Sequence, residues 1–267
     1  MRSLASAFLS SAFSIGAALL AQQQAQIVAV SYSCSGDDIE TLGLSCSDEE
    51  PCPVFLELTS VESAGARIFV AGNFHTERNT LHSALFASED GGKTWTEPHR
   101  RMRAAGLDQI QFVDFQHGFI GGNVTLGSLP RDPFFLVTTD GGKSFRDRPI
   151  FDEGRIGAIL QFYFETKNNG SLIFDRTKRP EDGNRYELHD SLTGGDTWMP
   201  RQMSSKPLIL KRTQLSAEDR GWRIREDAKS KTIRVEQKTD KWITVAVFPI
   251  GAGECKPPEP KPSAPLP

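Results

Sequence analysis

One short sequence pattern occurs three times along this chain. Its copies read SEDGGKTW at 88–95, TTDGGKSF at 138–145 and SLTGGDTW at 191–198. The aromatic residues that close the copies are separated by steps of 50 and 53 residues. A pattern that returns at a fixed period of this size indicates a repeat architecture, in which each repeat is one supersecondary unit. We therefore expect the chain to consist of similar units of about fifty residues.

Each copy has the composition of a tight hairpin turn. An Asp side chain accepts hydrogen bonds from nearby backbone N–H groups, and glycine reaches the positive φ that such a turn requires. The flanking hydroxyl residues tie the strand ends together, and the aromatic residue begins the outgoing strand. We assign structural roles to Ser88, Asp90, Gly92, Thr94 and Trp95, to Thr138, Asp140, Gly142, Ser144 and Phe145, and to Ser191, Thr193, Gly195, Thr197 and Trp198. Thr193 replaces the aspartate in the third copy, so a weaker acceptor serves that turn.

These turns resemble the Asp-box of the bacterial neuraminidase repeat (BNR) families, which marks one hairpin per blade in β-propellers. Within that superfamily, residues 106–150 look like a repeat of the photosystem II assembly and stability factor-like group, and the resemblance extends over about four repeats. It implies an all-β propeller of four-stranded antiparallel blades. Members of that group are non-enzymatic propellers that bind proteins, and sortilin-type ectodomains use the same boxes to bind peptides or proteins. The present chain differs from the photosynthetic factors in its four cysteines and smaller number of blades.

The number of blades follows from the apolar segments between the boxes. Alternating apolar residues at 54–60, 110–115, 159–164 and 208–215 predict the inner strand of one blade each, and these periods assign 54–251 to the propeller. The cysteine-containing segment 22–53 contributes one or two further strands, at 27–33 and 39–44. Those strands complete a fifth blade or cap a four-bladed ring, so the sequence predicts four or five blades.

Both ends of the chain have a distinctive composition. Residues 1–21 contain one basic residue, an apolar run and small residues, which is typical of a secretory signal peptide. An uncleaved anchor helix is the alternative, although the run is short for a membrane span. With the signal removed, no transmembrane segment is predicted, and we expect a secreted or periplasmic protein. The proline-rich residues 252–267 predict an extended, disordered tail.

Four cysteines in an exported chain favour disulfides over a metal site. Of the three possible connectivities we favour Cys46 with Cys52 and Cys34 with Cys255, which ties the two ends of the mature chain together. No C-x-x-C motif, histidine pair, phosphate loop or calcium loop occurs, so we expect neither metal nor cofactor. The net charge of −3 argues against a nucleic-acid partner.

The resemblance also raises a catalytic alternative. Sialidase-like enzymes with Asp-boxes use a Tyr nucleophile with a Glu partner, an Asp as acid or base and three arginines that grip a carboxylate. Tyr163 and Glu165 lie two residues apart on one face of a predicted strand and are the catalytic candidates. The predicted inner strands carry no set of three arginines. We therefore favour an exported non-enzymatic propeller, monomeric or homodimeric, that binds a protein, peptide or other extracellular ligand. A sialidase-like glycoside hydrolase or a carbohydrate-binding propeller is the alternative.

Overall fold

The strands of the computed structural model gather into four sheets, built largely from consecutive antiparallel strands. The structure describes residues 25–126, 129–177 and 182–257. Within these ranges three sheets have four strands, one has five, and α-helix is confined to one short segment. Each sheet forms one blade, so the fold is an all-β propeller of four blades, the lower of the two predicted counts. The predicted signal peptide at 1–21 lies outside these ranges.

Blades 2 and 3 are antiparallel meanders whose strands follow in chain order. Blade 2 contains β6 (Ala105–Phe112), β7 (Gly118–Leu126), β8 (Leu129–Thr138) and β9 (Arg146–Pro149). Blade 3 contains β10 (Ala158–Phe164), β11 (Gly170–Asp175), β12 (Tyr186–Ser191) and β13 (Met199–Ser204). The inner strand predicted at 159–164 is β10. The one predicted at 110–115 overlaps β6, which begins and ends earlier.

Blades 1 and 4 combine strands from both ends of the described chain. Blade 1 contains β3 (Cys52–Ala64), β4 (Arg67–His75) and β5 (Thr80–Ser88), and β17 (Gly251–Cys255) and β2 (Tyr32–Ser33) are added beside β3. Blade 4 contains β14 (Trp222–Asp227), β15 (Thr232–Lys238), β16 (Trp242–Pro249) and β1 (Gln26–Ile27). Residues 252–255 of the predicted tail thus belong to β17, because their backbone pairs with β3 and β2.

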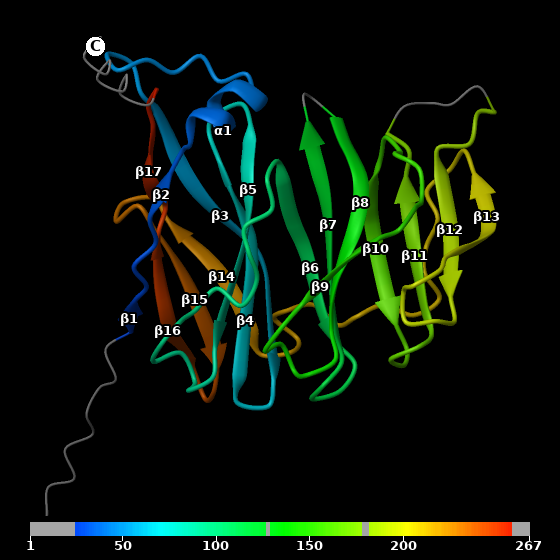
Figure 1. The fold of residues 1–267 in the computed structure, drawn as a ribbon. Helices are drawn as coiled ribbons and strands as arrows, with labels where there is room; N and C mark the ends of the chain where they lie inside the picture. Colours follow the sequence, from blue (N-terminus) through cyan, green and yellow to red (C-terminus); the bar gives the residue numbers. More distant parts are fainter. Residues whose placement is uncertain (1–24, 127–128, 178–181, 258–267) are drawn as a thin grey trace, which may run out of the picture.

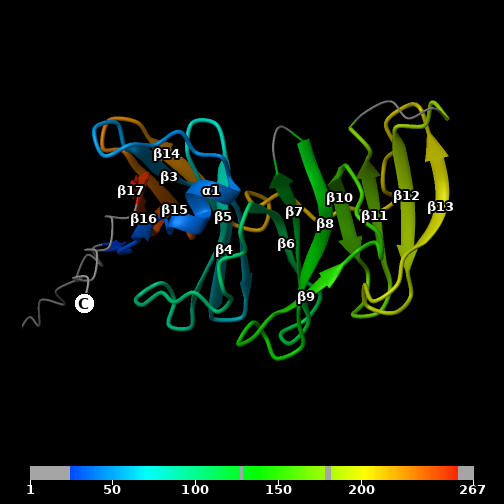
Figure 2. The same cartoon turned by 45° about the horizontal axis from the view of Figure 1, so that its top comes forward.

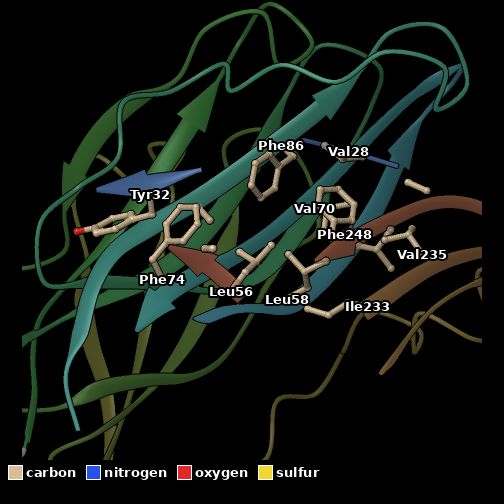
Figure 3. Packing of buried hydrophobic residues seen from close by; sticks show 14 of the residues in the cluster. Val28, Tyr32, Leu56, Leu58, Val70, Phe74, Phe86, Ile233, Val235 and Phe248 are labelled. Carbon is tan, nitrogen blue, oxygen red and sulfur yellow. The ribbon is translucent and has the colours of Figure 1, made fainter. Parts of the chain in front are cut away.

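The four blades stand side by side in the spatial order 4, 1, 2, 3 (Figures 1 and 2). Apolar clusters fill the three junctions between neighbouring blades. Between blades 1 and 4, the rings of Phe86 and Phe248 lie 5.1 Å apart (Figure 3), and between blades 2 and 3 those of Phe119 and Phe164 stack at 3.5 Å. In the described part of the chain no core cluster joins blade 3 to blade 4. The blades therefore form an open arc.

A long connector, residues 205–221, carries the chain from blade 3 back to blade 4 past the intervening blades. The strand predicted at 208–215 is wrong, because this part of the connector has no ladder partner. Its alternating residues point instead at the other blades. Leu210 is buried against blade 3, and Gln214 donates hydrogen bonds to the Glu62 carboxylate in blade 1 at 2.5 Å. The period of two therefore occurs here in a segment that pairs with no strand.

The N-terminal segment contains a helix where a strand was expected. The strand predicted at 39–44 is wrong, since α1 covers Gly36–Thr41. Ser35 caps the helix: its hydroxyl accepts from the backbone N–H of Asp38, and the Asp38 carboxylate accepts from the backbone N–H of Ser35. Such a reciprocal pair stabilises the first helical turn. The segment predicted at 27–33 forms only the two short strands β1 and β2, which pair in parallel with β16 and β17.

Two disulfides fasten the N-terminal segment to blade 1. Cys34 pairs with Cys255 across a Cα–Cα distance of 4.9 Å, and Cys46 pairs with Cys52 across 5.3 Å. These are the favoured pairs, and the first joins the N-terminal segment to β17. No helix within 25–126, 129–177 and 182–257 has the length and apolar character needed to cross a membrane.

The Asp-box hairpins share one hydrogen-bond pattern. Asp90 accepts from the backbone N–H groups of Lys93 and Thr94 and from the Thr94 hydroxyl, and Gly92 donates its N–H to the Ser88 hydroxyl. Hydrogen bonds from the backbone and hydroxyl of Thr94 hold the pKa of Asp90 at about 2. The box in blade 2 repeats the pattern with Asp140.

The third box is weaker, as its sequence predicts. The Thr193 hydroxyl accepts one backbone N–H, that of Thr197, at 2.9 Å. The second glycine of the box nevertheless keeps its left-handed φ, at 86° for Gly195 against 91° for Gly92 and 83° for Gly142. A Cβ on Gly142 would lie 2.3 Å from the Phe69 ring, so that position requires glycine for space as well as for backbone conformation.

Candidate functional site

Tyr163 and Glu165 lie together on the free face of blade 3, the face that has no neighbouring blade. Along β10 the rings of Phe162 and Phe164 are buried toward blade 2, so the alternate positions 163 and 165 point the other way. Both residues line a pocket of about 390 Å³ between this face and the connector. We call it the end-face pocket. The candidate pair is therefore at one end of the arc and not at the mouth of a central channel.

The floor of the end-face pocket is apolar. Leu188 of β12 and Leu210 of the connector are 4% and 5% exposed, and they form a small cluster with Ile173 of β11. Tyr163 and Tyr186 are half-buried and pack against this cluster. The connector thus closes one side of the pocket by inserting Leu210 into the blade face, with Leu208 packed beside it.

The rim of the pocket is charged. Arg212 of the connector forms an ion pair with Glu165, and Arg201 of β13 donates to Asp190 at 2.8 Å. Ser171 also donates to Asp190, at 2.6 Å. Desolvation acts against ionisation of Asp190, but these hydrogen bonds outweigh it and hold the pKa of the carboxyl below its ordinary value. Each rim carboxylate is thereby matched with one arginine.

This arrangement lacks the parts of a sialidase centre. Two arginines of the described chain line the pocket, and both are already paired with its carboxylates. Within the described residues no hydrogen bond joins the phenol of Tyr163 to Glu165 or to another base, whereas an activated nucleophile needs a base within hydrogen-bond reach. The structure brings the predicted pair into one pocket but does not place three arginines beside it.

A second hollow lies on the concave side of the arc, where the inner strands face the connector. It has a volume of about 550 Å³. A β-bulge interrupts each of β3, β6 and β10 at the same point of the repeat, and the bulged residues are Thr59, Asp108 and Leu160. Bulges re-aim side chains, and Thr59 and Asp108 both line this hollow. We call the hollow the concave recess.

Asp108 lines the recess together with Glu218, Arg220 and Arg223. The Asn123 amide donates to its carboxylate at 2.7 Å, and Asn73 of blade 1 makes the equivalent bond to Glu57 at 3.0 Å. Desolvation by the recess walls raises the pKa of Asp108 to about 6, repulsion from Glu57 adds to this rise, and the bond from Asn123 opposes it. A carboxyl with this pKa can carry a proton near neutrality. Sequence reasoning missed Asp108 because a bulge has no signature in the apolar alternation.

The blades and their Asp-box hairpins make the chain a β-propeller of the kind that the Asp-box resemblance implies. No protein-family model and no curated protein sequence matches it. Solved structures with a similar fold include YCF48 bound to D1 peptide, with 13% identity over 73% of this chain and 56% of that chain and a TM-score of 0.39.

Two carbohydrate-active enzymes are also similar in fold. The GH74 xyloglucanase from Xanthomonas campestris has 14% identity, covering 70% of this chain and 28% of that chain, with a TM-score of 0.37. The α-L-arabinanase from Penicillium chrysogenum complexed with arabinobiose has 9% identity, covering 81% and 64%, with a TM-score of 0.40. The present chain spans less than two thirds of the length of each of these proteins.

Proposed function

We propose that this protein is an exported, non-enzymatic propeller that binds an extracellular protein or peptide at the end-face pocket. The observation that carries the proposal is the pocket itself: an apolar floor of Leu188 and Leu210 inside a rim of paired charges. Binding sites for proteins and small ligands commonly combine an apolar centre with a polar rim. The two disulfides fit a place of action outside the reducing cytosol.

Exposed apolar side chains on the same blade support this choice of site. Leu192 lines the pocket and is 63% exposed, and Met199 lies opposite the rim residue Asp190 in the β12–β13 ladder and is 55% exposed. Apolar residues gathered on one face of a protein mark interaction surfaces more often than residues scattered singly.

The opposite end of the arc is different in character. On blade 4, Arg223 lies 4.2 Å from the ring centre of Trp242 and pairs with Glu236, and Arg234 pairs with Asp227 at 2.7 Å. A face covered by mutually paired charges is well solvated and offers little apolar area to a partner. The two ends of the arc are therefore unequal, and the apolar end is the better binding surface.

A random dodecapeptide library displayed on phage tests the proposal. Peptides selected on the wild-type protein are measured against Asn169→Trp, which fills the pocket from its exposed rim, and against Lys93→Trp, the same bulky residue on an exposed turn of blade 1. We expect enriched peptides to bind the wild type and Lys93→Trp equally, and Asn169→Trp about tenfold more weakly. Equal binding to all three proteins would contradict the proposal.

A glycoside hydrolase centred on the concave recess is a second candidate function. The raised pKa of Asp108 and the neighbouring Glu57 favour it, because glycosidases pair a protonated carboxyl with an ionised one. Release of nitrophenol from a panel of p-nitrophenyl glycosides measures this activity. Hydrolysis by the wild type that Asp108→Asn abolishes would establish the enzyme, whereas hydrolysis that survives this change, or none at all, would remove it.

A further inference from the structure

We infer that the ligand of the end-face pocket is an acidic peptide segment, bound in extended form with an apolar side chain as its anchor. The inference rests on the proposed function and names the chemistry of the partner. Its basis is the way in which the connector already occupies part of the same surface, together with the balance of charge around the pocket.

The connector shows how this face accepts a segment that makes no backbone ladder with it. Between residues 207 and 215 its backbone has no ladder partner within the described part of the chain. Side chains hold it instead. Leu210 is buried against Ile173 and Leu188, while the adjacent Ile209 is 84% exposed and Leu215 is 65% exposed. Leu210, with Leu208 packed beside it, therefore seats this unpaired segment on the blade, and Leu192 and Met199 leave further apolar area uncovered.

The charge around the pocket determines which charge the partner should carry. Among the residues that the structure describes, three basic ones line it, Arg201, Lys211 and Arg212, against two acidic ones, Asp190 and Glu165. The two arginines are paired with the two carboxylates, and Lys211 has no acidic partner within the described residues. The next basic residue along the connector, Lys206, is also exposed. A carboxylate brought to this rim meets unmatched positive charge, whereas a basic peptide is repelled.

Extended peptides that bind along a surface alternate the side chains they bury with the side chains they expose. A segment in which apolar residues alternate with Asp or Glu therefore matches both the uncovered apolar area and the positive charge of the pocket. Its apolar residues reach the uncovered leucine and methionine side chains, and its carboxylates remain at the rim beside Lys211. The exposed rim contributes mainly to association rate and selectivity, so the affinity is expected to weaken with salt.

The same phage selection supplies the test. Pocket-dependent peptides are sequenced, and one of them is synthesised with a fluorescent label, both as selected and with its Asp and Glu replaced by Asn and Gln. Binding is measured by fluorescence anisotropy to the wild type, to Lys211→Glu and to Lys93→Glu, which makes the same charge change on the turn of blade 1. Each titration is repeated at about 50 mM and about 500 mM salt.

We expect the enriched peptides to be acidic, the amide version to bind about tenfold more weakly, and Lys211→Glu to lose a similar factor while Lys93→Glu loses none. Pocket-dependent peptides that are neutral or basic would overturn this inference but leave the binding function standing. So would equal affinity for Lys211→Glu and Lys93→Glu. Failure to enrich any peptide sensitive to Asn169→Trp would overturn the binding function as well.

Discussion

The indole Nε1 of Trp222 donates a hydrogen bond to the hydroxyl of Ser63 at 3.0 Å, across 159 positions of sequence. The bond joins β14 of blade 4 to β3 of blade 1. The Trp222 side chain is 2% exposed and belongs to the core that these two blades share. Blade 4 is thus docked on the first blade of the chain and not on blade 3, which precedes it in sequence.

The Trp222→Phe variant measures this docking contact. It removes the N–H donor and leaves the partly buried hydroxyl of Ser63 without its partner, so we expect a loss of about 1 kcal/mol in the free energy of unfolding. Urea denaturation followed by circular dichroism checks the value. Trp242→Phe on the free face of blade 4 is the control, and an equal effect of both changes would show that the Ser63 bond contributes nothing specific.

The disulfide between Cys34 and Cys255 closes a loop of 221 residues, whereas the one between Cys46 and Cys52 closes a loop of six. In the chain-entropy model the longer loop contributes about 5 kcal/mol and the shorter one about 2 kcal/mol. Replacing each pair by alanines and measuring urea denaturation compares them. We expect loss of the Cys34–Cys255 bond to lower the free energy of unfolding more than loss of the Cys46–Cys52 bond. The reverse order would mean that the Cys34–Cys255 bond is dispensable for stability.

A complete Asp-box can be restored in blade 3 by Thr193→Asp. The carboxylate gains a second backbone donor, as Asp90 has, so we expect the midpoint of thermal unfolding at pH 7 to rise by about 2–4 °C. In the intact box the pKa of Asp90 is about 2, below its unfolded value of 3.8. The gain should therefore be complete above about pH 4 and vanish as the pH falls to about 2. A gain that is independent of pH would contradict the carboxylate mechanism.

Asp108→Asn should stabilise the protein at neutral pH. The pKa of Asp108 is about 6 in the folded protein and 3.8 in the reference state, so folding favours the protonated form and stability falls as the pH rises from about 4 to beyond 6. Asparagine keeps the shape and the acceptor for Asn123 but cannot ionise. We expect a gain of about 1 kcal/mol at pH 7.5, reduced for the solvent exposure of this group, and none at pH 4.

Asp114→Asn is the matched control for this pH dependence. Desolvation disfavours the Asp114 carboxylate, but hydrogen bonds from Gln116 and His117 outweigh it and keep the pKa of that group below its ordinary value. The sign is therefore opposite: the variant should lose stability at pH 7.5 and match the wild type at low pH. Denaturation curves at pH 7.5 and at low pH give the free energy of unfolding of each variant. If the stability of both variants responded to pH in the same way, the raised pKa of Asp108 would be refuted.

Local signals in the sequence predict the repeat unit well. The boxes around Asp90 and Asp140 contain all the groups that their turns use, and the alternation at 159–164 identifies β10 because its partners are nearby in sequence. The sequence allows three cysteine connectivities, and the structure has the one that we favour. Each of these features depends on residues that lie close together in the chain or on chemistry that allows few alternatives.

Long-range placement is the part that the sequence does not reveal. The alternation at 208–215 has the period of a strand, yet no neighbouring strand lies beside it, and only the tertiary structure shows that Leu210 packs on blade 3. The helix at Gly36–Thr41 depends on the cap formed by Ser35 and Asp38, which outweighs the apolar character of Ile39 and Leu44. Tyr163 and Glu165 share a face, as predicted, but the residues that surround them come from the connector.

The chain passes from β16 in blade 4 to β17 in blade 1, and this path determines at which end the arc can be lengthened. Strands from both ends of the described chain lie in blades 1 and 4, where β1, β2, β17 and the Cys34–Cys255 bond fasten them together. Blade 3 contains no strand from either terminus of the described chain, and within that part of the chain the connector is the segment that crosses its free face. A further hairpin unit inserted between β13 and the connector would therefore lengthen the arc at that end while the fastened end stayed as it is.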